Sequence, residues 1–423
     1  MPGETNKRVI LLIGNLTYRG DAFVRAAERL GLEPIQGLDL PRPLADYWQA
    51  TLPLDFKLPD KAVGDLVAFA RERPVRAIVC VDDSAQVIAA RACQELGLAC
   101  NAPQAALAAR DKRRMRQAMA AAGVRSPRFR VLHSDDDPRV VASTIDYPCV
   151  VKPTLLSGSQ GVLRADDADE FVRAFECTRA IALATGGKPG EARRAEILVE
   201  DYIDGFEVAL EAILTDGALT PLALFDKPDP LVGPTFEETI YVTPSRLPQA
   251  TQQAIFDTTA EACAALGLRE GPVHAELRVN DEGAWIVEVA GRSIGGLCSQ
   301  ILRFGTEGLS LEELILRHAL RLGDAPTERE SRAGGVMMIP IPAAGMLKRV
   351  EGVAEAEAVP GVEGVEISIP LNHPVVPLPE GASYLGFIFA RADTPEQAEA
   401  ALREAHRRLR FVIVPHIVLM REP

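Results

Sequence analysis

Two glutamates in one short stretch of the chain have the residue type and spacing that could hold a divalent cation. Residues 271–296 read GPVHAELRVNDEGAWIVEVAGRSIGG and include Glu276, Glu288 and, shortly after them, Arg292. Mg²⁺ binds a few carboxylate oxygens and completes its octahedron with water and phosphate. The pair therefore suggests a site for Mg²⁺ and a nucleotide. Equally, the two glutamates could lie on a solvated strand face, where they would balance Arg278 and Arg292.

A lysine followed by small residues could bind the phosphates of that nucleotide. Lys152 lies near the end of the apolar run YPCVVKP, and residues 154–161 then read TLLSGSQG. Such a loop can close over phosphates with its backbone N–H groups and hydroxyls, while the lysine supplies a point charge. Gly and Ser are also the default residues of tight turns, so an ordinary hairpin is the alternative.

The two glutamates need a scaffold, and the alternation of residues 271–289 predicts a β-hairpin with its turn at 280–283. The residues assigned to one face are Ala275, Leu277 and Val279, and those assigned to the other are His274, Glu276 and Arg278. The second strand, 284–289, carries Glu288. Carboxylates on neighbouring strands could then point into one space.

Strands alternate with helices over the first hundred residues. Strands are expected at 8–13, 33–37 and 76–81, and helices at 21–30, 61–73 and 82–95, with irregular connections between 41 and 59. This alternation predicts a parallel sheet. The first strand-to-helix turn, 14–20, lacks the GxGxxG spacing that brings backbone against a pyrophosphate, so we expect no dinucleotide site there.

Further elements are predicted along the rest of the chain. A helical stretch at 101–122 is followed by helices at 167–183 and 249–266, a helical region ending at 322, and a strand-rich last portion. In that portion one helix is well signalled, with Thr394 as N-cap and Gln397 completing a capping box. We expect this last portion to contribute packing and no chemistry.

Composition limits the classes of function. A chain of 423 residues with 47% hydrophobic content can form about three domains. Its seven scattered cysteines form no CxxC pair, which favours a reducing cytoplasm. No secretory signal or membrane span is expected. The net charge of −13 argues against a nucleic-acid partner.

Several segments occur in an order and spacing that together resemble the ATP-grasp superfamily. They are Lys112, YPCVVKP at 147–153, LLSGSQGV at 155–162, ILVEDYIDGFEV at 197–208, HAELRV at 274–279 and WIVEVAGR at 285–292. The resemblance implies a mixed α/β and α+β chain with the ATP-grasp fold. The implied domains are an N-terminal parallel-sheet domain (1–110), a helical linker and central subdomain with the glycine loop (111–203), a C-terminal subdomain with the metal site (204–322) and a strand-rich lobe (323–423).

The resemblance also implies a role for each residue that matches a motif. Lys112 and Lys152 would contact the phosphates of ATP under a mobile loop that contains Ser157, Gly158, Ser159 and Gly161. Glu200, with the main chain at Tyr202 and Ile203, would hold adenine, and Glu207 the ribose. Glu276 and Glu288 would bind Mg²⁺, for which Mn²⁺ can substitute. Arg292 and Lys152 would be the catalytic residues, with Arg292 on the carboxylate substrate and its phosphorylated form.

One position departs from the general pattern. Many members carry Asn two residues after the second metal-binding glutamate, whereas this chain has Ala290. The run Glu288-Val289-Ala290-Gly291-Arg292 is similar to the L-amino-acid ligase branch, which joins unprotected amino acids into dipeptides, and so is the strand-rich lobe. The resemblance therefore implies amino-acid substrates and a homodimer, and leaves open how many metal ions bind.

The expected reaction joins a carboxylate to an amine through an acyl phosphate at the expense of ATP. His274, Glu237 or Glu238, and the residues Ser293, Gly295 and Gly296 are candidates for the substrate pocket. Solvated acids and a core histidine are the alternatives for the first three. Two other functions stay open: an ATP-dependent carboxylase that uses bicarbonate and a biotin-like amine, and a nucleotide-binding sensor without catalysis.

Overall fold

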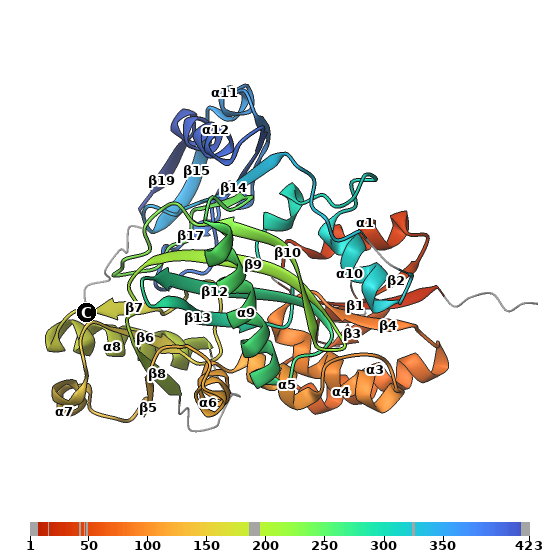
Figure 1. Ribbon diagram of the computed structural model, residues 1–423, viewed down its shortest axis with the longest axis horizontal. Helices are drawn as coiled ribbons and strands as arrows, with labels where there is room; N and C mark the ends of the chain where they lie inside the picture. The colour runs from red at the N-terminus through yellow and green to blue at the C-terminus, as the bar shows by residue number, and fades with distance from the viewer. Residues whose placement is uncertain are drawn as a thin grey trace, which may run out of the picture.

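The computed structural model describes residues 7–15, 17–41, 44–45, 47, 50–185, 195–323 and 326–415. Figure 1 shows three regions around a large central sheet: the N-terminal unit in red and orange, a small sheet in olive, and the C-terminal lobe in blue. The site described below lies where these regions meet.

The N-terminal unit is built on a parallel sheet, as the alternation of strands and helices predicts. Its strands are β1 (Arg8–Ile13), β2 (Glu33–Asp39), β3 (Leu52–Leu54) and β4 (Ala77–Cys80), in the order β3-β2-β1-β4, and every pair is parallel. Its helices are α1 (Gly20–Arg29), α3 (Pro59–Glu72) and α4 (Gln86–Leu96), with the 3₁₀ turn η1 (Asp83–Ala85) before α4. The expectation of irregular chain between 41 and 59 misses β3, whose Leu52 and Leu54 are buried.

The small sheet carries the residues around Lys152. After α5 (Pro103–Arg110) and α6 (Lys112–Ala122), it contains β5 (Phe129–His133), β6 (Cys149–Pro153), β7 (Leu163–Ala165) and β8 (Glu196–Asp201), in the order β5-β8-β6-β7. Helices α7 (Pro138–Val141) and α8 (Ala168–Thr185) complete this region, and the buried rings of Phe171 and Phe175 fix α8 to the sheet. The helical stretch predicted at 101–122 is two helices, because the side chain of Asp111 accepts hydrogen bonds from Arg113 N and Arg114 N and starts α6.

The large sheet runs from the hairpin into the C-terminal lobe, with the strand order β13-β12-β9-β10-β11-β14-β18-β16. Its strands are β9 (Phe206–Thr215), β10 (Ala218–Asp226), β11 (Ile240–Thr243), β12 (Gly271–Asn280), β13 (Gly283–Ala290), β14 (Ala333–Ile339), β16 (Val362–Ile367) and β18 (Gly386–Ala392). Helix α9 (Gln249–Leu266) packs against this sheet, whereas α10 (Leu311–Ala319) packs between it and α1. The pairing of β11 with β14 makes the sheet continuous across residue 322.

The C-terminal lobe adds a second, smaller sheet. It consists of β15 (Gly345–Glu351), β17 (Pro374–Val375) and β19 (Arg410–Val414), in the order β17-β15-β19, with α11 (Val353–Glu357) and α12 (Pro395–Arg408). Thr394 is the N-cap of α12, as predicted, and accepts a hydrogen bond from Gln397 N. Both bonds of a capping box are found instead at α10, between Ser310 and Glu313.

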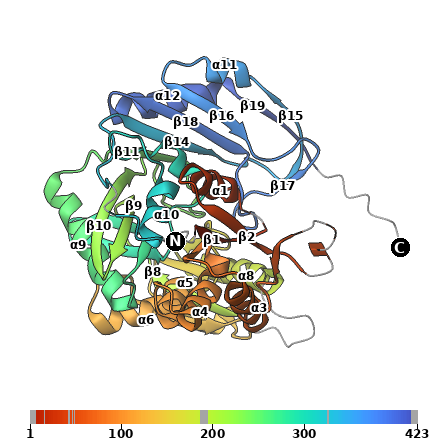
Figure 2. The ribbon, with the colours of Figure 1, turned by 90° about the vertical axis from the view of Figure 1, so that its right-hand side faces the viewer.

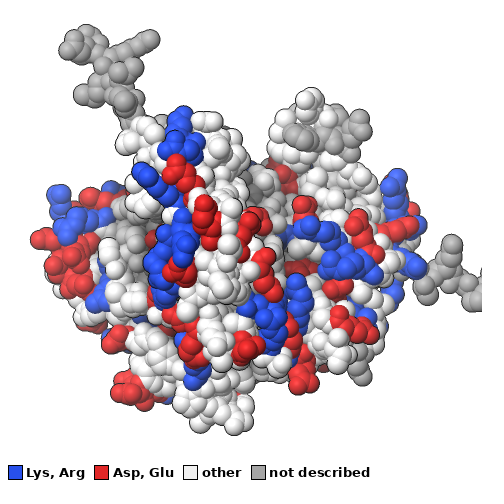
Figure 3. All heavy atoms as spheres, turned by 90° about the horizontal axis from the view of Figure 1, so that it is seen from above, with Lys and Arg blue, Asp and Glu red and all other residues white. Residues whose placement is uncertain are grey.

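The N-terminal unit and the C-terminal lobe share one hydrophobic core. Figure 2 shows the C-terminal lobe, in blue, above the N-terminal unit, and the buried side chains of Phe23, Ile301, Val336 and Phe387 belong to one cluster. Lys and Arg are interspersed with Asp and Glu on the face shown in Figure 3. Among the described residues, no helix has the length and apolar character needed to cross a bilayer.

Candidate active site

Two adjoining cavities lie between the small sheet, the large sheet and the N-terminal unit. The first has a volume of about 970 Å³ including its mouth. It is lined by most residues that the motifs single out: Lys112, Lys152, Ser157, Gly158, Ser159, Glu200, Tyr202, Ile203, Glu207, His274, Glu276, Glu288 and Arg292. Residues from separate parts of the chain are thus brought to one place, and we refer to this space as the nucleotide cavity.

The hairpin β12–β13 places the two predicted metal-binding glutamates side by side. Glu276 and Glu288 are register partners across the hairpin, next to a β-bulge that follows Glu276. The predicted faces are confirmed, because Ala275 and Leu277 are fully buried in the core behind the sheet whereas Glu276 lines the cavity. Carboxylate oxygens of this kind fit a hard cation such as Mg²⁺.

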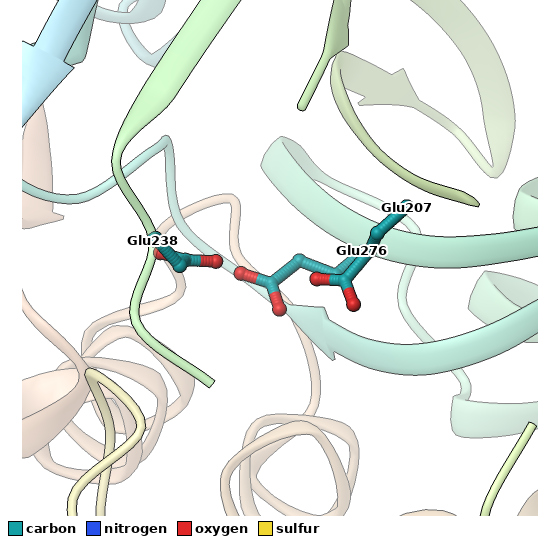
Figure 4. A group of neighbouring side chains, drawn as sticks. All are labelled: Glu207, Glu238 and Glu276. Carbon is teal, nitrogen blue, oxygen red and sulfur yellow. The ribbon is translucent and has the colours of Figure 1, made fainter. Parts of the chain in front are cut away.

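Three carboxylates also converge beside the hairpin. Glu207, Glu238 and Glu276 each offer an oxygen within 4.8 Å of the others, and Figure 4 shows the carboxylates of Glu238 and Glu276 facing each other. The ammonium group of Lys227 lies among them, with Nζ 2.8 Å from Glu207, 2.5 Å from Glu238 and 3.7 Å from Glu276. Burial opposes the charge of Lys227, but the three glutamates raise its pKa above the ordinary value. The cluster is therefore held together by an internal cation.

His274 is buried between two carboxylates. Its Nδ1 lies 2.5 Å from Glu211 Oε1 and its Nε2 lies 3.3 Å from Glu276 Oε1. Burial alone would lower the pKa of His274, but the hydrogen bonds and charges of both glutamates raise it to about 9. A cationic imidazole thus orients Glu276. Both ring nitrogens of His274 thus have hydrogen-bond partners, as in a core histidine, and the side chain also lines the cavity.

Lys112 connects the glycine loop, residues 154–161, to the hairpin β12–β13. At the start of α6, its Nζ donates to the carbonyl oxygen of Leu156 (2.7 Å) and to Glu288 Oε1 (3.0 Å). The side chain is 7% exposed, so the ion pair with Glu288 is shielded from bulk water. A phosphate entering the cavity would meet this ammonium group beside the carboxylate.

The carboxylate of Glu200 forms ion pairs with two cations, and the sequence predicts neither pair. Arg116 donates to both of its oxygens, at 2.7 and 3.2 Å, and Lys152 Nζ lies 2.7 Å from Oε2. Burial favours the neutral acid, yet Arg116 and Lys152 together lower the pKa of Glu200. Its carboxylate orients Lys152. Because both carboxylate oxygens are already paired, Glu200 would contact adenine only through its main chain.

The other implied adenine and ribose contacts are also held in place. The ring of Tyr202 stacks on Phe236, with centroids 6.4 Å apart, and Arg278 donates to the carbonyl oxygen of Ile203 at 2.8 Å. Arg278 also bonds Glu207 at 3.0 Å, so Glu207 pairs with both Arg278 and Lys227. These contacts form a rigid cavity wall.

Arg292 is fixed by the N-terminal unit. Its Nε donates to Asp83 Oδ2 at 2.7 Å, and its Nη1 donates to the carbonyl oxygen of Ser293 at 2.8 Å. Burial would raise the pKa of Asp83, but Arg292 more than offsets this and the pKa is lowered. Asp83 comes from the turn between β4 and α4, where the sequence pattern predicts only the start of a helix.

The second cavity, of about 1540 Å³ with its open side, adjoins the first and shares Ser157, His274, Glu276 and Arg292 with it. We refer to this second space as the substrate cavity, and its lining also includes Gly295, Gly296 and Glu238. Glu237 is not among the described residues that line either cavity, so Glu238 is the better placed of the two acids. Ser293 is buried and its hydroxyl accepts a hydrogen bond from Arg19.

The glycine loop is held in a compact turn. Gly158 and Gly161 adopt φ of +63° and +71°, in the left-handed region that favours glycine. Gly161 lies under the loop rather than in the nucleotide cavity, since a side chain there would meet Pro153 and Ile181. The strands on either side, β6 and β7, pair antiparallel, so the segment is also a hairpin connection.

Sequence patterns miss several residues of the site. Three of them, Lys227, Arg116 and Asp83, match no motif and belong to the site through ion pairs that form only in the folded chain. Two others, Met338 and Tyr384, line the substrate cavity from the C-terminal lobe. The lobe therefore contributes to the site and does more than pack. A signal for Lys227 existed in its position at the end of an apolar strand, directly after Asp226.

Comparison with known proteins agrees with this architecture. The family model of the ATP-grasp domain matches residues 145–301, that of the ATP-grasp N-terminal domain matches 24–99, and that of L-amino acid ligase C-terminal domain 2 matches 337–414. The crystal structure of L-amino acid ligase from Bacillus licheniformis superposes with a TM-score of 0.82 at 25% identity, covering 97% of this chain and 100% of that one.

Two groups of curated ligases also align with the chain. Alanine–anticapsin ligase of Bacillus subtilis is 33% identical over 221 residues, which are 49% of this chain and 46% of that protein. D-alanine–D-alanine ligase of Pseudomonas fluorescens is 28% identical over 234 residues, 53% of this chain and 66% of that protein. The chain thus spans less than two thirds of either ligase. Taken with the site, these matches show that the chain belongs to the ATP-grasp superfamily and is similar to its L-amino acid ligase and D-alanine–D-alanine ligase branches.

Proposed function

We propose that this protein joins two amino acids, or a similar small acid and amine, through an acyl phosphate formed with ATP. The observation that carries the proposal is the junction of the two cavities at Ser157, His274, Glu276 and Arg292. A triphosphate in one cavity and two small substrates in the other would meet there. The names of the aligned proteins, alanine–anticapsin ligase and D-alanine–D-alanine ligase, support this choice.

The first step needs positive charge, since a carboxylate and the γ-phosphate repel each other. In the proposed step the substrate carboxylate oxygen forms a bond to the γ-phosphorus, and the bond from phosphorus to the ADP oxygen breaks. Lys112 and Lys152 lie in the nucleotide cavity where they would contact phosphates, and Arg292 lies at its junction with the substrate cavity. Preorganised charges of this kind lower the barrier because they need no rearrangement during the reaction.

Mg²⁺, or Mn²⁺ in its place, would be held by Glu276 and Glu288 and would neutralise phosphate charge. His274 and Lys227 keep Glu276 ionised and oriented, and Lys112 holds the carboxylate of Glu288 in place through their ion pair. Ala290 contributes no ligand atom in place of the Asn found in many relatives, so the number of bound ions is a separate question. Adenine would lie against Tyr202 and Ile203, and the ribose near Glu207.

The second step forms the amide. The amine nitrogen attacks the acyl carbon, the carbon–nitrogen bond forms, the bond to the phosphate oxygen breaks, and phosphate and a proton leave. Arg292 would steady the developing oxyanion, and its hydrogen bond to Asp83, which holds the guanidinium at the junction of the cavities, supports this role. Glu238 and His274, with Gly295 and Gly296, would line the substrates, and the buried Ser293 would lie behind them.

The intermediate is sensitive to water, so the loop of residues 157–161 would close over bound ATP. We further propose a cytoplasmic homodimer that acts on small molecules and not on nucleic acids. The seven cysteines are all free thiols, which fits a reducing compartment.

A phosphate-release screen with ATP, Mg²⁺ and all pairs of amino acids, followed by mass analysis of the products, tests the function. We expect ADP release only with productive pairs, together with an amide product. ADP release that depends on bicarbonate would favour a carboxylase, and ATP binding without release would favour a sensor. Glu288→Gln should slow amide formation about a hundredfold or more. A near wild-type rate in that variant would contradict the metal assignment.

A further inference from the structure

A further cavity lies between the N-terminal unit and the large sheet. It has a volume of about 780 Å³ with its open side and is lined from β4, α4, α10 and the start of β12. Among the described residues, none lines both this cavity and either cavity of the site. Three free thiols, those of Cys80, Cys93 and Cys100, line it, and we refer to it as the thiol cavity. The proposed reaction uses none of these thiols.

Cys93 and Cys100 are direct neighbours in the thiol cavity. The thiol of Cys93 hydrogen-bonds to Cys100, and the thiol of Cys100 donates to the carbonyl oxygen of Ala90 at 3.7 Å. Cys93 is 1% exposed, whereas Cys100 is half-buried and lines the open cavity. A small molecule in the cavity would therefore meet Cys100 first, with the sulfur of Cys93 next to it.

The backbone around the pair brings the two thiols together. Cys93 lies in the last turn of α4, which ends at Gly97 in the left-handed conformation. The chain reverses there and returns Cys100 to the side of the helix. The next residue is fixed in turn, because the Asn101 side chain accepts a hydrogen bond from Glu270 N at 2.9 Å and donates one to the Glu270 carbonyl oxygen at 2.7 Å. Both thiols are thus held close together before any bond between them forms.

The hydrogen bond makes the thiols of the pair chemically unequal. It lowers the pKa of Cys100, although burial opposes this change, and together with burial it raises the pKa of Cys93. Because the thiolate is the nucleophile in thiol chemistry, Cys100 is the attacking group and Cys93 the thiol that follows. The third thiol differs, since Cys80 donates to the carbonyl oxygen of Asp82 and burial raises its pKa.

We propose that Cys93 and Cys100 form a modification site at which hydrogen peroxide converts the two thiols to a disulfide. The sulfur of Cys100 attacks one peroxide oxygen, so that a sulfur–oxygen bond forms, the oxygen–oxygen bond breaks and hydroxide leaves. The sulfur of Cys93 then attacks the resulting sulfenic acid. The sulfur–sulfur bond forms, the sulfur–oxygen bond breaks, and the hydroxyl leaves as water with the proton of Cys93. In total, two thiols lose two hydrogens and the peroxide becomes two molecules of water.

The sequence around the pair allows a direct measurement on the full chain. After treatment with hydrogen peroxide, the remaining thiols are blocked with iodoacetamide. Trypsin cleaves after Arg91 and Arg110 and releases residues 92–110, which contain both cysteines. We expect this peptide to be lighter by two hydrogens, about 2 Da, and to carry no label. Further cleavage after Glu95 should give two fragments that separate only after reduction with dithiothreitol.

Cys177 is the matched internal control, because it is also half-buried but burial raises its pKa. A thiol with a lowered pKa has a larger thiolate fraction, so we expect the disulfide in residues 92–110 to form at least about tenfold faster than Cys177 is oxidised. Cys80→Ser should leave this rate unchanged. In Cys93→Ala the sulfenic acid of Cys100 should persist and be trapped by dimedone, with no disulfide.

Three results would overturn the proposal. They are conversion of Cys100 to a sulfinic acid while Cys93 stays a free thiol, a disulfide that joins Cys80 to either of the two, and oxidation of residues 92–110 no faster than that of Cys177. The decisive masses come from the wild-type chain, so the test stands even if Cys93→Ala does not fold. They are also independent of the proposed ligase activity, because they record a covalent change in the protein itself.

Discussion

Gln160, in the glycine loop, donates a hydrogen bond of 2.7 Å from Nε2 to the main-chain carbonyl oxygen of Glu380 in the C-terminal lobe. Next to it, Gly161 N donates to the carbonyl oxygen of Pro379 at 2.9 Å. The glycine loop, which we propose covers ATP, is thus tied to a segment of the lobe that continues to Tyr384 in the lining of the substrate cavity. The proposed closure over the nucleotide and the shape of the substrate cavity would therefore depend on the same segment.

The variant Gln160→Glu should loosen this contact, because it replaces the amide donor by a carboxylate that faces a carbonyl oxygen. A hydrogen bond contributes about 0.5–1.5 kcal/mol, so we expect the KM for ATP to rise up to about tenfold. Water should also enter more easily, which would raise ADP release relative to amide formation. Steady-state kinetics with product analysis measure both quantities.

The matched control for the loop is Gln253→Glu, the same change at an exposed pair on α9. It should leave the KM for ATP and the ratio of amide to ADP as in the wild type. Hydrogen exchange of residues 154–161 gives an independent readout, and equal protection in Gln160→Glu and the wild type would contradict the role of the contact.

Asp83 is expected to act as a positioning residue for Arg292. In Asp83→Asn the size of the side chain is kept while the charge-assisted hydrogen bond is weakened; such bonds contribute about 1.5–3 kcal/mol. We predict that kcat/KM for amide formation falls about ten- to hundredfold, while the KM for ATP changes little. Asp60→Asn, at a surface pair with Arg91, is the control and should have wild-type kinetics. A split in which only the KM for ATP moves would refute this assignment.

Local patterns predict the elements of the site better than its contacts. The alternation in residues 271–289 correctly gives the hairpin and its faces, and the structure ends α4, α6 and α9 at Gly97, Gly123 and Gly267, each in the left-handed conformation that favours glycine. β3 is missed because a short strand with Pro53 at its centre has no detectable periodicity. The continuation of the large sheet into the lobe is missed since strand order depends on pairing over long sequence distances.

The partners of the site's charges are missed for the same physical reason. Lys227 pairs with Glu207 and Glu276 from other strands, and Arg292 pairs with Asp83 from the N-terminal unit. No spacing rule connects such residues, because only the folded chain brings them together. The residue types of the motifs predict which groups gather, whereas the internal cations that hold them are found from the structure.

Glu200 should make the stability of the protein depend on pH. Its folded-state pKa is lowered, since the charges of Arg116 and Lys152 outweigh its burial, so its contribution is present above the unfolded pKa of about 4.3 and is lost as pH falls through the folded pKa. We predict that Glu200→Gln lowers the Tm at pH 7 and that the difference from the wild type narrows below about pH 4.3. Thermal unfolding at several pH values measures this difference. The exposed Glu355→Gln serves as control, and a difference that stays constant with pH would contradict the ion-pair explanation.

Lys227 should be essential for the stability of the carboxylate cluster. Its side chain is 3% exposed and contacts Glu207, Glu238 and Glu276, so Lys227→Met removes the shared cation while keeping most of the side-chain volume. Removing one partner from a buried ion pair costs about 3–5 kcal/mol, because an uncompensated charge is left behind. We expect a loss of this size in urea unfolding, and a change of less than about 1 kcal/mol for Lys61→Met at the exposed pair with Asp65. Combining Lys227→Met with Glu238→Gln should recover part of the loss, since one of the unpaired carboxylates is then neutral. Equal effects of Lys227→Met and Lys61→Met would show that the cluster does not need its internal cation.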